Sequence, residues 1–302
     1  MTTPQGAAIE LPQHLVEHAL EFADGRREPA EPRNAATVVL ARDGHEVGAG
    51  ALEIYFLRRV VGMAFAGGMA VFPGGGVDQR DFPEDDAGDD IGWAGPSQQE
   101  WADRLGTDLD LARALVCAAV RETYEESGVL LAGPTADSVV DDTTGDDWET
   151  DRQALEARDL SFSEFLLKRD LLLRSDLLTP WACWVTPVFE PRRYRTWFFL
   201  ARLPEGQRTR DVSTESSEVM WLSVRDALRQ TEAKELLMLP PQFCTCLELY
   251  DVRDCEHAAE LGRVRELSLV QPRARFDGDA AHLEIPQRLV DLGEDVRARL
   301  DR

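Results

Sequence analysis

Hydrophobic and polar positions along the chain alternate between helical and strand spacing, which predicts a mixed α/β protein. Near the amino end, "LPQHLVEHALEFA" has apolar residues three and four positions apart, as on one face of a helix. "ATVVLARD" and "EIYFLRR" are short apolar runs typical of strands. Between the helix and these strands, "DGRREPAEPRN" is rich in proline and charge and predicts a linker. The core is therefore expected to begin at about residue 35.

The second half of the chain continues this alternation. "WACWVTPVFE" and "YRTWFFLARL" predict two paired strands, and a double proline opens a helix in "LPPQFCTCLELYDVRDCEHAAEL". The tail "LVQPRARFDGDAAHLEIP" predicts a returning pair of strands. The charge-rich segment "DDTTGDDWETD" is expected to be a solvated connection.

One predicted helix concentrates negative charge near its end. It is expected to start at Thr107 and Asp110, which have the spacing of a capping box, and to stop at Gly128. The stretch before it, from residue 79 to about 107, is acidic and poor in β-branched residues. We expect that stretch to be an irregular loop with one short helix.

Three carboxylates on one helical face repel one another unless a cation lies between them. In "RETYEESGV", Glu122, Glu125 and Glu126 stand at i, i+3 and i+4 and so share a face. Carboxylates at this spacing suit Mg²⁺ or Mn²⁺, which also bridge substrate phosphates. Such an ion polarises a phosphoryl oxygen and makes a water molecule more acidic. Arg121, four positions before Glu125, is placed to pair with it and hold its carboxylate inward.

Composition narrows the class of partner and the compartment. A formal net charge of −23 argues against binding a nucleic-acid backbone, so an anionic ligand would need metal ions or a local arginine cluster. The start "MTTPQGAAIELPQ" lacks a basic segment and an apolar core, and no apolar run approaches the roughly 20 residues of a membrane span. Five scattered cysteines suit a reducing compartment. We expect a cytoplasmic protein that binds neither nucleic acid nor membrane; whether it forms a homodimer stays open.

Two segments resemble the halves of the Nudix box. "RETYEESGV" is similar to R-E-U-x-E-E-x-G-U, where U is apolar, with Thr123 departing at the first U, and "FPGGGVD" is similar to the Pro-Gly-Gly turn. Gly75 and Arg121 are 46 positions apart, 32 more than the fourteen of the standard box. An insertion at this place resembles the coenzyme A diphosphatase branch of the Nudix hydrolases. "LTPWACWVTP" and "RRYRTWFFLA" are also similar to that branch.

The resemblance implies a Nudix-like α/β/α sandwich with a mixed β-sheet. We expect an N-terminal helix and linker over residues 1–34, the core over 35–230 with its insertion at about 79–107, and a C-terminal helical extension over 231–302. In the insertion, Trp93 and Trp101 favour a lid over the cleft or a contact to the adenine or pantetheine arm of a substrate. A solvated loop is the alternative.

The resemblance also assigns roles to residues. It implies metal ligation by Glu122, Glu125, Glu126 and Gly74, and catalysis by Glu125 and Glu126 with Arg121. The family supplies a further acid ahead of a strand that ends in tryptophan; Glu215 is favoured here and Glu218 is the alternative. The candidates for binding substrate phosphates through guanidinium forks are Arg58, Arg59, Arg192 and Arg193.

One position of the box departs from the family. The box has a glutamate eight positions before its arginine, and Arg113 occupies that position here. Either the insertion supplies a replacement, with Asp110 as the nearest candidate, or the glutamate is dispensable.

The activity implied is metal-dependent hydrolysis of a nucleoside diphosphate linked to another moiety. Resemblance to the branch favours coenzyme A or acyl-coenzyme A as the small-molecule nucleotide substrate, cleaved to 3′,5′-ADP and (acyl-)phosphopantetheine. ADP-ribose, NADH or another dinucleotide is the alternative substrate. A non-catalytic ligand sensor is the alternative from another class, and the three intact glutamates argue against it.

Overall fold

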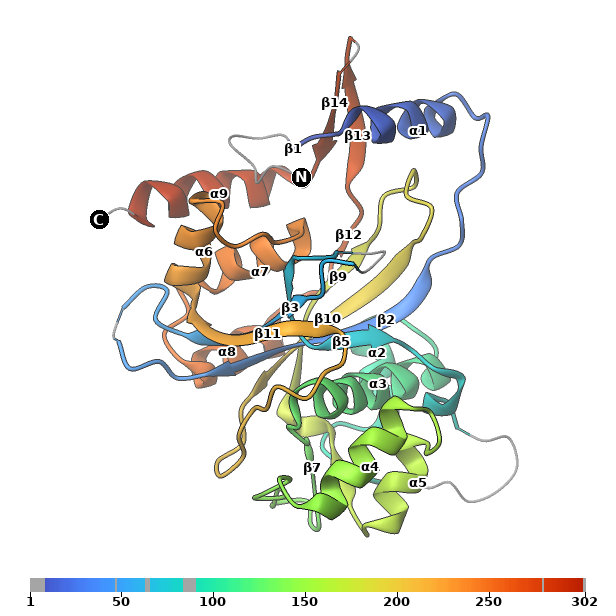
Figure 1. Cartoon of the computed structure of the whole chain (residues 1–302), viewed down its shortest axis with the longest axis vertical. Coiled ribbons are helices and arrows are strands. Elements are labelled where there is room, and N and C mark those ends of the chain that lie inside the picture. Colours follow the sequence, from blue (N-terminus) through green and yellow to red (C-terminus); the bar gives the residue numbers. More distant parts are fainter. Residues whose placement is uncertain (1–8, 47, 63–65, 84–90, 279, 301–302) are drawn as a thin grey trace.

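The computed structural model describes residues 9–46, 48–62, 66–83, 91–278 and 280–300. A mixed sheet lies at the centre with helices on both faces, which confirms the predicted α/β/α sandwich (Figure 1). Its strands follow the order β11-β3-β2-β10-β9-β12, and the short strands β4 and β5 pair with β3 and β2. The bounds are β2 (Arg33–Arg42), β3 (Glu53–Arg59), β4 (Ala70–Val71), β5 (Gly74–Gly76), β9 (Leu178–Val185), β10 (Tyr194–Arg202), β11 (Ser216–Ser223) and β12 (Leu269–Val270).

The central strands have continuous apolar runs because they are covered on both faces. In β2, Ala36, Val38 and Leu40 belong to one buried cluster. Val39 and Ala41, which point the other way, belong to a second cluster. β2 and β10 run parallel, whereas β9 and β10 form the antiparallel pair predicted from their patterns.

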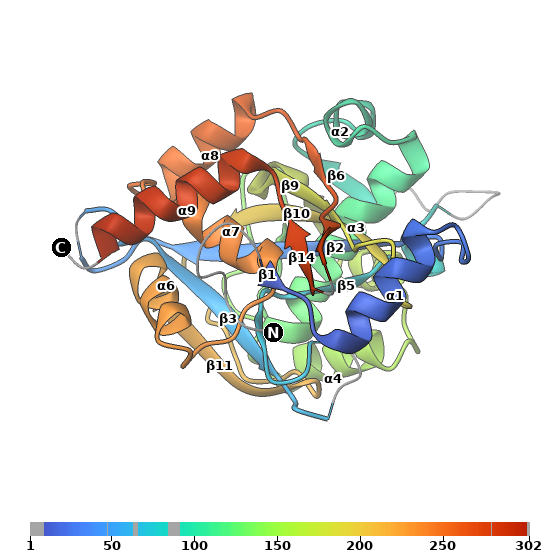
Figure 2. The same ribbon diagram turned by 90° about the horizontal axis from the view of Figure 1, so that it is seen from above.

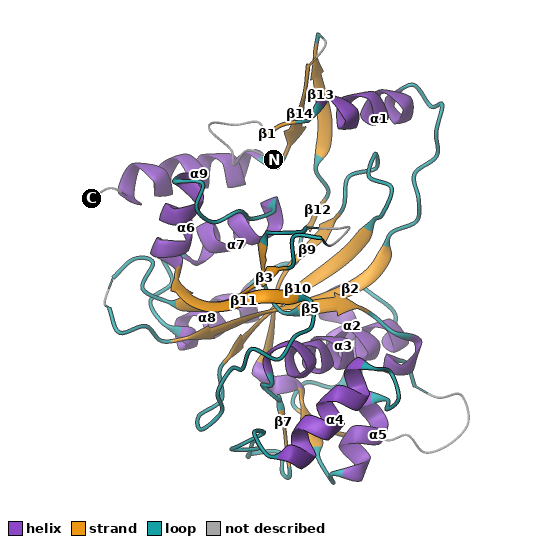
Figure 3. Ribbon diagram, in the orientation of Figure 1, coloured by secondary structure: helices purple, strands orange, loops and turns teal. Residues whose placement is uncertain are grey.

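Two groups of helices cover the two faces of the sheet, as the view from above in Figure 2 and the ribbon of Figure 3 show. The first group comprises α2 (Gln98–Leu105), α3 (Leu109–Ser127), α4 (Asp146–Glu156) and α5 (Phe162–Lys168). The second group comprises α6 (Val224–Glu232), α7 (Pro240–Leu249), α8 (Cys255–Val264) and α9 (Gln287–Leu300). The C-terminal extension therefore completes the second core, while the domain boundaries at residues 34 and 230 stay a prediction.

A strand near the amino end pairs with two strands from the last thirty residues of the chain in a small sheet beside the main one (Figure 1). It contains β1 (Ile9–Glu10), β14 (Ala280–Glu284) and β13 (Arg273–Asp277), and the predicted N-terminal helix α1 (Gln13–Ala23) packs against it. β13 and β14 are the predicted strand pair of the tail. A further small sheet joins β6 (Gly92–Ala94), β8 (Leu172–Arg174) and β7 (Ala132–Gly133), and two 3₁₀ turns are η1 (Gln79–Asp81) and η2 (Ser175–Leu177).

Much of the described part of the insertion packs into the core, so the solvated loop and a lid or substrate contact by Trp101 were wrong, while such a role for Trp93 stays a prediction. It forms η1, β6 and α2, and its residues 84–90 lie outside the described part of the chain. Trp101 is fully buried, and its ring lies 5.9 Å from that of Phe199 in the central sheet. Trp93 is half-buried and donates its indole N–H to the carbonyl of Pro96. The few apolar residues of the insertion gather on the inner face of α2 and in the segment 91–94, so a low average apolar content gave no sign of burial.

The segment from residue 141 to 151 is mostly exposed, as expected of a solvated connection, but it is not irregular throughout. Most of it forms α4, in which Asp151, Arg152 and Leu155 are buried. The two charged side chains are buried because each is paired with groups of opposite charge. In the part of the chain that is described, no helix combines the length and apolarity needed to cross a membrane.

Candidate functional site

Helix α3 carries the acidic segment and is fixed at both ends. Its N-cap is Asp108, whose carboxylate accepts the N–H of Leu111, so the helix begins one residue later than a cap at Thr107 would give. It ends as predicted at Gly128, which has the left-handed φ of 73° that glycine adopts without strain. Nineteen residues of regular helix thus hold the glutamates in one orientation.

Carbonyl groups in the last turn of α3 have specific partners. Arg152 in α4 donates from Nη1 to the carbonyl of Glu125 at 2.7 Å. The backbone N–H of Arg210 donates to the carbonyl of Ser127, and the hydroxyl of Thr143 donates to that of Gly128. These bonds satisfy acceptors that a helix end otherwise leaves open. No pattern in the sequence predicts these bonds, because the three donors lie in other segments of the chain.

The Pro-Gly-Gly turn faces the glutamates across a short gap. The N–H of Gly74 donates to Oε2 of Glu126 at 2.8 Å. A Cβ atom at Gly75 would lie 2.5 Å from Oε1 of Glu122, so a larger residue there would displace that carboxylate. At Gly74 a Cβ atom would meet the backbone of β2 at 2.5 Å. The structure therefore brings Gly74 together with Glu126 and Gly75 together with Glu122, while metal ligation by Gly74 stays a prediction.

Arg121 is held by an acid that the sequence analysis did not name. Its Nε and Nη2 donate to the two carboxylate oxygens of Asp81 at 2.8 and 2.9 Å, and both side chains are almost fully buried. Its Nη1 donates to Glu122 at 2.8 Å and to Glu125 at 3.2 Å. The expected contact between Arg121 and Glu125 is present, but the bidentate pair with Asp81 has the shorter bonds.

Counting from the glycine of the box would have found Asp81. A glutamate eight positions before the arginine of the standard box is six positions after its glycine, and Asp81 is six positions after Gly75. The 32-residue insertion lies between this acid and Arg121, so counting back from Arg121 reaches Arg113 instead. Asp110 lies in the first turn of α3, about 16 Å along the helix from Arg121, and does not take the place of the acid.

Burial raises the pKa of all three glutamates in α3. For Glu125 the pKa rises to about 7, first through burial and then through repulsion from Glu122. Arg121 acts against these shifts at Glu122 and Glu125, and the N–H of Gly74 does so at Glu126. Without a further cation, the site favours retention of protons.

The donor set fits a hard divalent cation. Within the described ranges, no three acidic, histidine or cysteine side chains already surround a common point. The reason is that Arg121 binds Glu122 and Glu125, while Gly74 binds Glu126. Carboxylates that are crowded, partly buried and raised in pKa are groups that Mg²⁺ or Mn²⁺ would stabilise. Glu122, Glu125 and Glu126 are therefore the residues that could hold the ion.

Two of the predicted phosphate-binding arginines form ion pairs with Glu215 and Glu218, the two candidates for the further acid of the family. Arg59 at the end of β3 lies 2.7 Å from Glu215, and Arg58 lies 3.1 Å from Glu218, its register partner in β11. The charges of Arg59 and Glu215 both act on the pKa of Glu126, which places this pair beside the carboxylates. The side chain of Glu218 is 57% exposed.

The other two predicted arginines lie elsewhere. Arg192 and Arg193 are in the connection between β9 and β10, where Arg192 is exposed. Arg193 is buried, and its guanidinium donates to the carbonyls of Thr186 and Ala30. The structure thus gives Arg193 a contact that fastens the N-terminal linker to the sheet. Its role toward a substrate stays a prediction.

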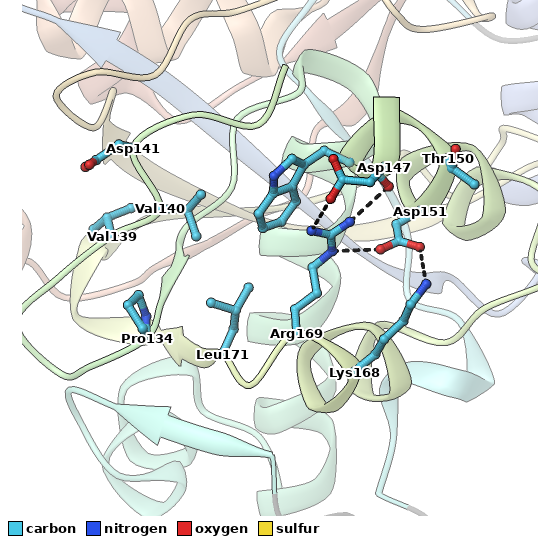
Figure 4. Close-up of a pocket in the computed structure, with 11 residues that line it drawn as sticks. Pro134, Val139, Val140, Asp141, Asp147, Thr150, Asp151, Lys168, Arg169 and Leu171 are labelled. Atoms are coloured by element: carbon cyan, nitrogen blue, oxygen red, sulfur yellow. Dashed lines mark hydrogen bonds and ion pairs between the residues drawn. The ribbon is translucent and has the colours of Figure 1, made fainter. Parts of the chain in front are cut away.

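A separate cavity of about 840 Å³ lies between α4, the segment 134–141 and the end of α5 (Figure 4). Its charged wall has Arg169 between Asp147 and Asp151, and its apolar wall contains Pro134, Val139, Val140 and Leu171. Tyr124, about 160° around α3 from Glu126, donates to the carbonyl of Trp148 in the wall. The cavity therefore lies on the opposite side of α3 from Glu126. None of the predicted site residues lines it.

Comparison with known proteins identifies the family. The family described as the NUDT19 Nudix domain matches residues 96–249, about half of the chain. The chain belongs to the Nudix hydrolases. A crystal structure of a Nudix hydrolase from Alicyclobacillus acidocaldarius has a TM-score of 0.62 and 26% identity, and the match covers 79% of this chain and 99% of that one. The fold and the class of enzyme predicted from the box are thereby confirmed.

Curated relatives of this Nudix hydrolase include enzymes of the coenzyme A branch. An acyl-coenzyme A diphosphatase NUDT19 of Homo sapiens is 26% identical over 282 residues, 80% of this chain and 73% of the relative. One of Xenopus laevis is 25% identical over 219 residues, 63% of this chain and 58% of the relative. A Caenorhabditis elegans protein named as a nudix hydrolase is 25% identical over 245 residues, 80% of this chain and 68% of the relative. The resemblance to the coenzyme A diphosphatase branch is confirmed.

Proposed function

We propose that this Nudix hydrolase uses Mg²⁺ or Mn²⁺ to cleave the pyrophosphate of coenzyme A or acyl-coenzyme A. The products would be 3′,5′-ADP and (acyl-)phosphopantetheine. The observation that carries the proposal is the cluster of Glu122, Glu125 and Glu126 closed against the glycine turn. The bound ion would polarise a phosphoryl oxygen and increase the acidity of a water molecule.

The residues of the chain would divide the work as follows. Glu122, Glu125 and Glu126 would hold the ion, with a carbonyl of the turn at Gly74. Arg121 would keep Glu125 oriented through the bonds described above. Glu215 would accept the proton of the attacking water, since its charge acts on two of the glutamates. Comparison of kcat for E215Q and E218Q tests this choice, because the acid that takes the proton gives the larger fall.

Arginines would bind the substrate phosphates. Arg59 is the first candidate, because it lies beside the glutamates and its pair with Glu215 can be exchanged for a phosphate oxygen. Arg58 is the second, in the same strand end. Arg192 and Arg193 stay candidates for a more distant part of the ligand, which an adenosine 3′,5′-bisphosphate group would reach. Loss of affinity for coenzyme A in R59Q but not in R193Q would mean that Arg59 binds the substrate and Arg193 does not.

The substrate follows from the names of relatives and is tested by a panel assay. Purified protein with Mg²⁺ would be incubated with coenzyme A, acetyl-coenzyme A, a long-chain acyl-coenzyme A, ADP-ribose and NADH, and the products separated by mass. Cleavage of the coenzyme A compounds with the highest kcat/KM supports the proposal. Preference for ADP-ribose or NADH makes the protein a dinucleotide pyrophosphatase. Binding without turnover of any compound would favour a ligand sensor.

Divalent cations are expected to stabilise the protein in a pH-dependent way. The folded pKa values of Glu122, Glu125 and Glu126 lie above their ordinary value of 4.5. Raised pKa values in the folded state favour folding while the three carboxyl groups are protonated. This contribution to the free energy of unfolding is complete below about pH 4.5 and is lost as the pH rises through the folded-state pKa values, about 7 for Glu125. A metal ion binds the deprotonated form, so 5 mM Mg²⁺ or Mn²⁺ should raise the melting temperature by several degrees at about pH 7.5 and much less at about pH 5.

Two controls separate this effect from general screening of a negative surface. NaCl at matched ionic strength should reproduce little of the gain. The triple variant E122Q/E125Q/E126Q should lose the gain and its pH dependence together. An equal gain in the triple variant would mean that the ion binds elsewhere on the protein.

A further inference from the structure

Arg113, which stands eight positions before Arg121, is buried beside the ion pair of Arg121 with Asp81. Its side chain is 3% exposed and lies in α3, two turns before Arg121. Its Nη1 donates to the backbone carbonyl of Asp81 at 3.1 Å. Its Nη2 is buried and has no partner. Burying a guanidinium with an unpaired N–H donor reduces the free energy of unfolding. Packing alone therefore does not account for an arginine at this position.

Two arginines of one helix hold the same aspartate from two sides. Arg113 binds the backbone of Asp81, and Arg121 binds its carboxylate with two hydrogen bonds. Cys117 lies one turn from each arginine, and its thiol feels the charges of Arg113, Asp81 and Arg121. The three charged groups are therefore neighbours around one side of α3. The last residue of η1, just before the insertion continues, is fixed to the helix at two points.

We propose that Arg113 is a positioning residue that acts through Asp81 and Arg121 on the carboxylate cluster. The proposal rests on the proposed function, because the cluster is taken to be the cation site. Arg113 fixes where the backbone of Asp81 lies, and the carboxylate of Asp81 fixes the guanidinium of Arg121. Arg121 in turn binds Glu122 and Glu125. A shift at Arg113 is thus passed to two of the glutamates through a short chain of hydrogen bonds.

The charges favour arginine at this position. Asp81, Glu122, Glu125 and Glu126 bring four acidic groups into a partly buried region, and Arg121 balances only one of them. Arg113 supplies a second buried positive charge, which leaves a net charge that one divalent cation would neutralise. A neutral side chain at position 113 would leave more uncompensated buried charge around Asp81.

The test replaces Arg113 by methionine, which fills a similar volume without charge or donors. R113M is expected to weaken Mn²⁺ binding about tenfold, measured by electron paramagnetic resonance without substrate, and to lower kcat by a similar factor with little change in KM. In the D81N background the same substitution should have almost no further effect on Mn²⁺ affinity, because its route through Asp81 is already broken. R113K, which keeps the charge and a donor, should recover most of the affinity.

The control is R174M. Arg174 is also buried and donates to a backbone carbonyl, that of Ser138, but it lies in β8 and is paired with Asp176. R174M should lose stability while Mn²⁺ affinity stays that of the wild type. If R113M does not fold, R113Q is measured in its place, with the same expected direction.

The results distinguish the inference from the function on which it rests. Wild-type protein that binds no Mn²⁺ and cleaves nothing would overturn the proposed function. Wild-type protein that binds Mn²⁺, together with R113M of equal affinity, would overturn only the role of Arg113. Equal losses from R113M in the wild-type and D81N backgrounds would also overturn it, since the effect would then not pass through Asp81.

Discussion

Replacement of Glu126 by glutamine is expected to lower turnover at least about a hundredfold, equivalent to roughly 2.7 kcal/mol of barrier. Glutamine keeps the size of the side chain and an oxygen that can accept the N–H of Gly74. It removes one charged ligand of the cation. Because burial raises the pKa of Glu126 well above its ordinary value, the substitution should leave stability unchanged or slightly higher. Initial rates at saturating Mg²⁺ and thermal melting measure the two effects.

A matched control is E232Q. Glu232 in α6 is also partly buried and paired with an arginine, Arg297, but it lies on the opposite face of the sheet from α3. E232Q should therefore keep the turnover of the wild type. Near wild-type rates in E126Q itself, with the metal saturating, would remove Glu126 from the catalytic set.

Elements whose pattern depends on neighbours in sequence could be predicted. The strands β2, β3, β9 and β10 have apolar runs that only a sheet covered on both faces accommodates. Helix α3 has both an apolar face and a glycine stop, and its start was predicted to within one residue. In each case the signal lies within about ten residues, so no tertiary information is needed.

Elements whose burial depends on distant partners could not be predicted. Trp101 is buried because Phe199 lies against it, and those two residues are 98 positions apart. Asp151 is buried because Lys168 and Arg169 bind it from the next helix and its end. The sequence shows in both places only polar or mixed segments, which more often lie in solvent. Mean polarity therefore hid two parts of the core.

The residues of the candidate site also fall into those that local sequence predicts and those that depend on distant segments. Glu122, Glu125 and Glu126 share a face by helical geometry alone, and the box adds the facing glycine turn. The pair of Arg59 and Glu215 depends on the register of β3 with β11, which the sequence does not give. Asp81 was missed for another reason. The insertion separates it from Arg121, so counting back from Arg121 does not reach it, whereas counting forward from Gly75 does.

Replacement of Asp81 by asparagine is expected to reduce the free energy of unfolding by about 3 kcal/mol, the lower end of the cost of breaking a buried ion pair. The lower end applies because Arg121 keeps Glu122 and Glu125 as partners. For the same reason Arg121 should compete more strongly with a cation for these glutamates. Mn²⁺ affinity and kcat should therefore fall along with stability. Urea denaturation and Mn²⁺ titration of the folded variant measure the two effects separately.

The matched control for this variant is D151N. Asp151 is as deeply buried as Asp81 and is bound by Lys168 at 2.6 Å and Arg169 at 2.7 Å, but it contacts none of the glutamates. D151N should thus lose stability without loss of Mn²⁺ affinity. If D81N behaves in the same way as D151N, then Asp81 only stabilises the fold. A loss of metal affinity confined to D81N would instead mean that Asp81 orients Arg121 for the cluster, because a general loosening of the core would affect both variants alike.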